Sequence, residues 1–84
     1  MSLKAVAWRA NFRGEETHDF RMQVTGSTEK ELKKAEKELV DWTLSGQGYD
    51  AKNDRSIRIF TRSFDNRKSC LSFTRGLSFE VKFV

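Results

Sequence analysis

Residues 28–43, with the sequence TEKELKKAEKELVDWT, decide the fold class of this chain. Thr28 and Glu31 have the spacing of a capping box, in which each side chain accepts a hydrogen bond from a backbone N–H at the start of a helix. The apolar residues that follow are three or four positions apart: Leu32, Ala35, Leu39 and Trp42. This spacing predicts an amphipathic helix of about 18 residues with one buried face. The glycines of residues 45–48 are expected to end it.

Two runs of alternating apolar and polar residues precede this helix. The first run, residues 3–12, places four apolar residues on one face: Val6, Trp8, Ala10 and Phe12. The second run places three apolar residues inward: Phe20, Met22 and Val24. A period of two is typical of half-buried strands, and Gly14 lies between the runs. The sequence therefore predicts an N-terminal β-hairpin.

The segment after the helix is predicted to contain three more strands. Residues 49–54 are polar and are predicted to form a connection, and strands are predicted over residues 56–64, 69–73 and 77–84. Residues 74–76 end in glycine, as in a three-residue hairpin loop. The expected fold is a single α+β domain over residues 1–84, with one helix on one face of a mainly antiparallel sheet and the order β-β-α-β-β-β.

The side of the predicted strand over residues 56–64 that faces the helix follows from the alternation of its residues. Four of its residues alternate on one side: Arg58, Phe60, Arg62 and Phe64. Burial of unpaired guanidinium groups is costly. We therefore expect Ile57 and Ile59 to face the helix, and the four alternating residues to face away from it.

Composition limits the class of protein further. The chain has 84 residues, 37% of them hydrophobic, and a net charge of +4 that lies entirely within residues 46–84. Cys70 is the only cysteine, so no intrachain disulfide can form, which favours a reducing compartment. No apolar run approaches the roughly 18–20 residues that cross a bilayer. The sequence predicts a cytoplasmic protein that is not inserted in a membrane.

The side of the sheet that faces away from the helix is the predicted binding surface. Arginine and aromatic side chains alternate there, and such a surface suits single-stranded nucleic acid or RNA, because rings stack on bases and cations hold phosphates. The predicted binding residues are Arg9, Arg13, Arg21, Arg58, Phe60, Arg62 and Phe64. A protein partner is the alternative, because interfaces are also enriched in arginine and aromatic residues. A homodimer through pairing of strand edges stays open as well.

The motifs of enzymes and metal sites are missing from the sequence. It contains no glycine loop that cradles phosphate, no nucleophile elbow and no zinc-ligand spacing. His18 and Asp19 are adjacent on a strand and would point to opposite faces, which disfavours a shared metal. Cys70 has no base near it in sequence. We therefore expect a non-enzymatic binding protein without catalytic residues, cofactor or metal.

The order of the elements carries one resemblance. The segments WRANF at residues 8–12, DFRM at 19–22 and TEKEL at 28–32 follow a hairpin-then-helix layout. This layout resembles very small phage-encoded proteins that bind and inhibit host machinery, including anti-CRISPR proteins. The resemblance implies an alternative function, that of a phage- or mobile-element-type inhibitor or accessory factor that binds a host protein or nucleoprotein complex. It implies no role for any individual residue.

Overall fold

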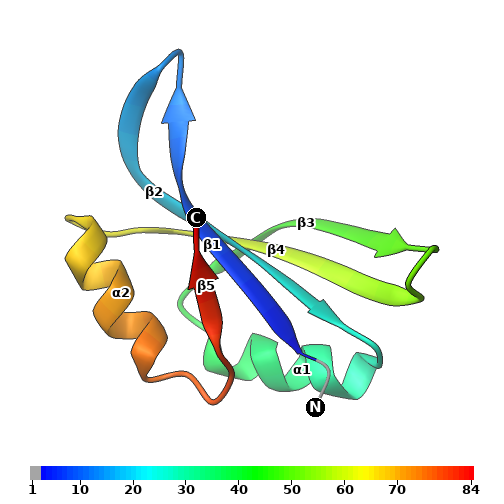
Figure 1. The fold of residues 1–84 in the computed structure, drawn as a ribbon. Helices are drawn as coiled ribbons and strands as arrows, with labels where there is room; N and C mark the ends of the chain where they lie inside the picture. Colours follow the sequence, from blue (N-terminus) through cyan, green and yellow to red (C-terminus); the bar gives the residue numbers. More distant parts are fainter. Residues whose placement is uncertain (1–2) are drawn as a thin grey trace.

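The chain folds into five strands and two helices (Figure 1). The computed structural model describes residues 3–84, without the side chains at positions 12 and 16. In chain order the elements are β1 (Lys4–Phe12), β2 (Glu15–Gly26), α1 (Glu29–Glu38), β3 (Thr43–Asp50), β4 (Arg55–Ser63), α2 (Arg67–Arg75) and β5 (Val81–Phe83). The predicted α+β class is confirmed, and the prediction of a single helix is wrong.

The strands form one mixed sheet in the order β3-β4-β2-β1-β5. The pairs β1/β2, β2/β4 and β3/β4 are antiparallel, and the pair β1/β5 is parallel. The N-terminal hairpin and the mainly antiparallel sheet are therefore confirmed. The tip of the β1–β2 hairpin extends well beyond the other strands (Figure 1).

Helix α1 begins where the capping box predicts. The Thr28 hydroxyl accepts a hydrogen bond from the Glu31 backbone N–H at 3.3 Å, and the Glu31 carboxylate accepts one from the Thr28 N–H at 3.2 Å. The helix is shorter than predicted, because it ends at Glu38 with Leu39 as its C-cap. Trp42 lies beyond the helix and donates its backbone N–H to the Leu39 carbonyl.

Strand β3 replaces the predicted helix end and part of the predicted polar connection. Its residues pair antiparallel with β4, with a register shift between Leu44 and Gly46. The backbone hydrogen bonds of this ladder hold the polar, glycine-containing segment in an extended form. Residues 51–54 make the turn into β4. The predictions for residues 45–50 were wrong because a local polar pattern does not reveal a partner strand, whereas residues 51–54 form the connection as predicted.

Helix α2 replaces a predicted strand and its hairpin loop. The Asn66 side chain caps the helix by accepting a hydrogen bond from the Ser69 N–H at 2.9 Å. Cys70 and Thr74 are buried at helical spacing, and Phe73 packs beside them against the core. The remaining predicted strand shrinks to the three residues of β5, which lie parallel to β1. The hairpin predicted for residues 69–84 is therefore wrong.

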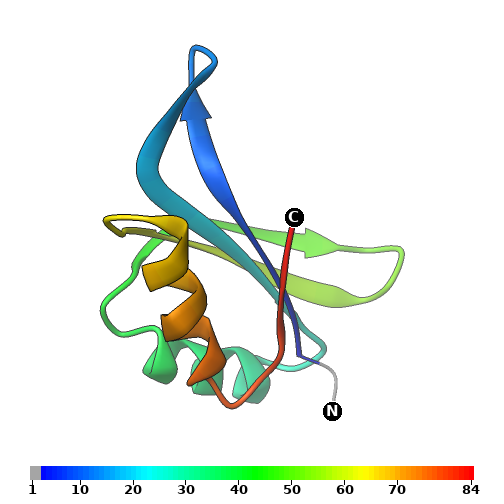
Figure 2. The same ribbon diagram turned by 60° about the vertical axis from the view of Figure 1, so that its left-hand side comes forward.

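Both helices cover the same face of the sheet. Helix α1 lies against β2 and β4, and the Phe73 ring of α2 lies 5.8 Å from the Trp42 ring, centroid to centroid. Figure 2 shows α2 at a steep angle to α1, partly overlapping one end of it. The core between helices and sheet includes the three predicted residues of β2, which confirms that part of the prediction: Phe20, Met22 and Val24.

Two predictions of which side chains face the helices are wrong. On β1, Ala5 and Ala7 are buried against the helices, because they pair in register with buried residues of β2. Alanine leaves room on this side of β1 for larger members of the core cluster, such as Phe79. On β4, Phe60 faces the helices and is only 3% exposed. The residues that alternate with these on β1 and β4 therefore face the other way, including Val6, Trp8, Ile57 and Ile59.

Candidate functional site

The face of the sheet opposite the helices, here called the bare face, has no helix over it in the part of the chain that the structure describes. Strand register assigns its residues, because directly paired residues point to the same side. The central positions of the bare face are Lys4, Val6, Trp8, Arg21, Gln23, Thr25, Ile57, Ile59, Thr61, Gly46, Gly48 and Lys82. Asp19, Asp50 and Arg55 lie at its margins.

A tryptophan and an arginine are neighbours on this face. Trp8 of β1 pairs with Arg21 of β2. Val6 and Gln23, two residues away on each strand, form the neighbouring pair on the same face. Trp8 is half-buried and Arg21 is exposed. Side chains paired across antiparallel strands are about 5 Å apart at their Cβ atoms. An indole ring and a guanidinium group therefore lie side by side on the bare face.

A flat apolar strip crosses the other half of the bare face. Ile57 and Ile59 are partly exposed there, and each pairs with a glycine of β3. A Cβ atom added at Gly46 would lie 3.6 Å from Ile59. The glycines therefore leave the flank of each isoleucine uncovered by a neighbouring side chain.

An arginine-containing hollow of about 420 Å³ lies at one end of the bare face. Its lining residues are Lys4, Gln23, Thr25, Asp50, Asn53, Arg55 and Ile57. Within it, Nε and one terminal nitrogen of Arg55 are buried and have no hydrogen-bond partner. A buried donor without an acceptor costs free energy, and an oxyanion is the strongest acceptor for a guanidinium group. These two nitrogens expose almost no surface, so an oxyanion in the hollow would reach them only after a shift of the Arg55 side chain, and it would lie near the Asp50 carboxylate.

The two carboxylates at the margins are occupied by local hydrogen bonds. Asp50 accepts from the backbone N–H groups of Lys52 and Asn53, and from the Asn53 side-chain amide at 2.8 Å. The hydrogen bond from that amide is the main reason that the pKa of Asp50 is lowered. Asp19 accepts from the Ser63 hydroxyl at 2.6 Å. The hydrogen bonds of Asp50 thus hold the β3–β4 turn, and the charge of Arg55, its cross-strand partner, lowers the pKa of Asp50 further.

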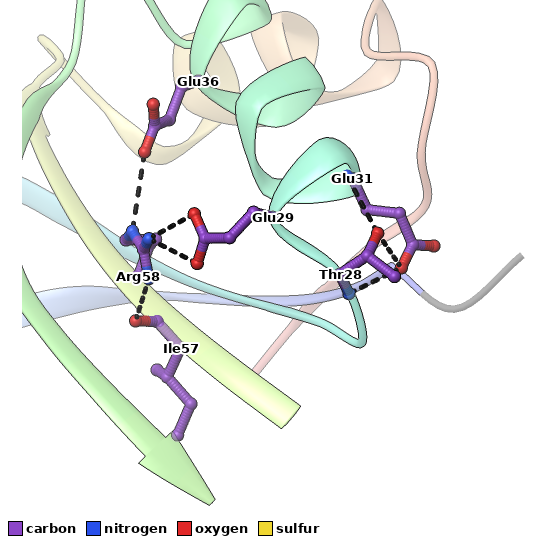
Figure 3. A network of polar contacts seen from close by, with 6 residues as sticks. All are labelled: Thr28, Glu29, Glu31, Glu36, Ile57 and Arg58. Atoms are coloured by element: carbon purple, nitrogen blue, oxygen red, sulfur yellow. Dashed lines mark hydrogen bonds and ion pairs between the residues drawn. The ribbon is translucent and has the colours of Figure 1, made fainter. Parts of the chain in front are cut away.

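The structure places Arg58, a predicted binding residue, on the opposite side of the sheet. Its side chain is only 13% exposed and lies between β4 and α1 (Figure 3). The guanidinium contacts Glu29 at 3.0 Å and Glu36 at 3.5 Å. The prediction failed because it treated buried arginine as unpaired, whereas α1 supplies two carboxylates.

Rings and arginines at one end of the helix-covered face pack against one another. The Phe64 ring contacts the Phe20 ring at 5.8 Å, and the Arg62 guanidinium lies over the Phe64 ring at 4.7 Å. Arg9 lies over Phe20 at 4.9 Å. Placing Phe60, Arg62, Phe64 and Arg9 on the bare face was therefore wrong. Cation–π stacking on these rings stabilises the partly buried guanidinium groups of Arg9 and Arg62.

The seven predicted binding residues do not form one surface. Arg21 lies on the bare face, whereas Arg13 is exposed at the β1–β2 turn with a φ of 53°. Sequence reasoning missed Trp8, Lys4 and Arg55. The sequence did contain one signal. Lys4 and Trp8 are four positions apart and lie on the same side of β1, and a lysine indicates that this side is exposed.

Cys70 lies on the buried face of α2. Burial raises the pKa of its thiol to about 11, although the guanidinium groups of Arg62, Arg67 and Arg9 lower it in part. The thiol is therefore protonated at neutral pH, and thiolate is the nucleophilic form. Among the side chains that the structure describes, no group of three or more histidine, cysteine, aspartate or glutamate residues is arranged to hold a metal ion.

The chain was compared with protein families, curated proteins and solved structures. No family model, no curated protein and no solved structure matches the chain. Neither helix in the described part of the chain has the length and apolar character needed to cross a membrane. Inferences about function therefore rest on the geometry of the bare face.

Proposed function

We propose that this protein is a non-enzymatic binding protein that holds single-stranded nucleic acid, DNA or RNA, on its bare face. The observation that carries the proposal is the half-buried indole of Trp8 on the bare face, together with the exposed cations of the same face, Lys4, Arg21 and Lys82, and the hollow beside Arg55. Cations that hold phosphates, beside a ring that stacks on a base, are the two parts of a single-strand platform.

The spacing of these parts fits a strand that runs along β1. Lys4 borders the hollow, and Trp8 lies four residues further along the same strand, about 13 Å away at the usual rise. A phosphate in the hollow would accept hydrogen bonds from Arg55, and a base would stack on Trp8. Arg21 and Lys82 are exposed and supply further positive charge.

Tryptophan fluorescence tests this proposal directly. The chain has two tryptophans, and Trp42 is only 6% exposed in the core. Addition of a 15-residue oligothymidylate or oligouridylate should quench the emission of Trp8. With four phosphates neutralised, the logarithm of the binding constant should fall with the logarithm of salt concentration at a slope of about −3. The two probes report whether DNA or RNA is preferred.

Substitution of Trp8 should weaken binding of a labelled oligothymidylate. Trp8→Ala removes the stacking surface and should lower the affinity about 5- to 150-fold, since stacking contributes about 1–3 kcal/mol per base. Trp8→Phe should restore most of the affinity. Tyr49→Ala is the control, because Tyr49 is an exposed ring on the edge strand and faces the other side. Equal affinities for Trp8→Ala and the native chain would overturn the proposal.

A protein partner is the second candidate, and the free edge of β3 favours it. Strand β3 is the outermost strand and contains no lysine, arginine or proline, the residues that usually protect sheet edges. Large apolar side chains are exposed on it or close to it: Val40, Leu44 and Tyr49. An extended segment of a host protein could add to this edge as a further strand. This arrangement would suit an inhibitor or accessory factor.

Nuclease treatment separates the two candidates. If β3 binds a protein, a host protein that copurifies with the chain should remain bound after nuclease digestion. The variant Leu44→Ser with Tyr49→Ser should then lose that protein and keep its affinity for oligothymidylate. Retention of the partner by this variant would exclude the β3 edge as its binding site.

A further inference from the structure

All four lysines of α1 lie on the face of the helix that points away from the sheet. They are exposed and line an open hollow of about 640 Å³ together with Leu3 and Glu31: Lys30, Lys33, Lys34 and Lys37. At about 100° per residue, their mean direction is roughly 180° around the helix axis from the buried Leu32 and Ala35. This lysine row and the bare face therefore lie on opposite sides of the molecule.

The glutamates of the same helix are all turned to other contacts. Glu29 and Glu36 hold Arg58 of β4 (Figure 3), and Glu31 completes the capping box. Glu38 accepts a hydrogen bond from the backbone N–H of Ser78 at 2.8 Å. In residues 3–84, no ion pair joins a lysine of the row to any of these carboxylates. A helix that is neutral in sequence thus presents a purely cationic ridge, with one glutamate at its margin.

We propose that the lysine row binds the phosphate backbone of duplex nucleic acid, so that one chain can join a duplex to the single strand on its bare face. This proposal rests on the proposed function. The row spans about 10 Å along the helix, which matches about three phosphates of one strand of a duplex. Lysine acts as a point charge and needs no specific geometry at phosphate. The row contains no aromatic side chain, so it offers contacts to phosphates but no surface for stacking bases.

A capture assay tests whether the two surfaces work together. Biotinylated oligothymidylate of 15 residues is immobilised, the protein is added, and a fluorescent 15-base-pair DNA duplex is offered in solution. The native chain should retain the duplex on the immobilised strand. The duplex alone should leave Trp8 emission unquenched, because its bases are stacked and unavailable to the bare face.

The variant Lys33→Gln with Lys37→Gln should lose the duplex and keep the single strand. Removal of two phosphate contacts should reduce the salt slope for the duplex by about 1.8. With 1 M salt as the reference state, the variant should then bind duplex about 60-fold more weakly than the native chain at 0.1 M salt. Quenching of Trp8 by oligothymidylate should be unchanged. The control Lys52→Gln with Lys68→Gln removes the same charge at exposed positions outside the row and should capture duplex like the native chain.

Equal duplex capture by the Lys33/Lys37 variant and the native chain would overturn the inference. That outcome includes bridging by a dimer that uses only bare faces, because such a dimer does not need the row. Failure of the proposed function looks different: oligothymidylate would not quench Trp8. The anisotropy of the labelled duplex alone would then still show whether the lysine row binds it.

Discussion

Phe60→Ala should remove a large part of the free energy of unfolding, whereas Ile59→Ala, one residue earlier on the same strand, should be tolerated. Phe60 is 3% exposed in the core, and truncation of a buried phenylalanine costs about 3–5 kcal/mol. A domain of 84 residues has a total free energy of unfolding of roughly 4–13 kcal/mol. Ile59 lies half-buried on the bare face, where truncation should cost about 1 kcal/mol.

Urea unfolding followed by the emission of Trp42 measures both changes. A Trp8→Phe background removes the second tryptophan and leaves a single reporter in the core. The reverse order of stabilities, with Ile59→Ala the more damaging, would mean that β4 presents its other face to the helices. The positions of the bare face would then be wrong along the whole strand, because a shift of one residue exchanges the two faces.

The triple variant Lys4→Gln, Arg21→Gln and Lys82→Gln should bind single-stranded oligonucleotide about 100-fold more weakly at 0.1 M salt. Each lost phosphate contact removes about 0.7 from the salt slope for single strands, so three contacts account for about two orders of magnitude. All three side chains are exposed, and folding should be unaffected. Quenching of Trp8 by oligothymidylate measures the affinity of the bare face separately from binding at the lysine row.

A charge-matched variant separates local contacts from overall charge. Lys33→Gln with Lys68→Gln and Arg75→Gln also removes three positive charges, from exposed positions on the two helices, away from the bare face. It should retain affinity close to that of the native chain. If both triple variants lose affinity equally, binding reflects net charge rather than the bare face.

The N-terminal half of the fold was predictable because its signals are local. The capping box of Thr28 and Glu31 places the start of α1, and the alternation of Phe20, Met22 and Val24 gives the inward face of β2. These patterns depend on residues that are close in sequence. Propensity and periodicity describe such segments well.

The C-terminal segment was mispredicted because its apolar residues fit both the period of two of a strand and the period of about 3.6 of a helix. Leu71 and Phe73 alternate as in a strand, whereas Cys70, Phe73 and Thr74 are spaced as in a helix. The cap at Asn66 decides for the helix, since its side chain binds the Ser69 N–H. The parallel pairing of β5 with β1 joins residues at the two ends of the chain, and no local pattern indicates it.

The side of β4 that faces the helices was mispredicted because the residues that contact its arginines are distant in sequence. Glu29 of α1 neutralises Arg58, and Phe73 of α2 lies 5.1 Å from the Arg62 guanidinium. An argument based on the cost of unpaired charge is sound only when such partners are absent. The candidate site changed for the same reason. Arg21 was correctly placed on the bare face, and the stacking role predicted for Phe60 and Phe64 is now proposed for Trp8.

The indole N–H signals of the two tryptophans in a nitrogen-proton correlation spectrum test the central claim most directly. On titration with a 15-residue oligothymidylate, the Trp8 signal should shift progressively to saturation, and the Trp42 signal should stay in place. Amides along β2 that precede and follow Arg21 should shift with Trp8. A stationary Trp8 signal, or a shift confined to Trp42 and the residues around Phe60, would contradict binding at the bare face.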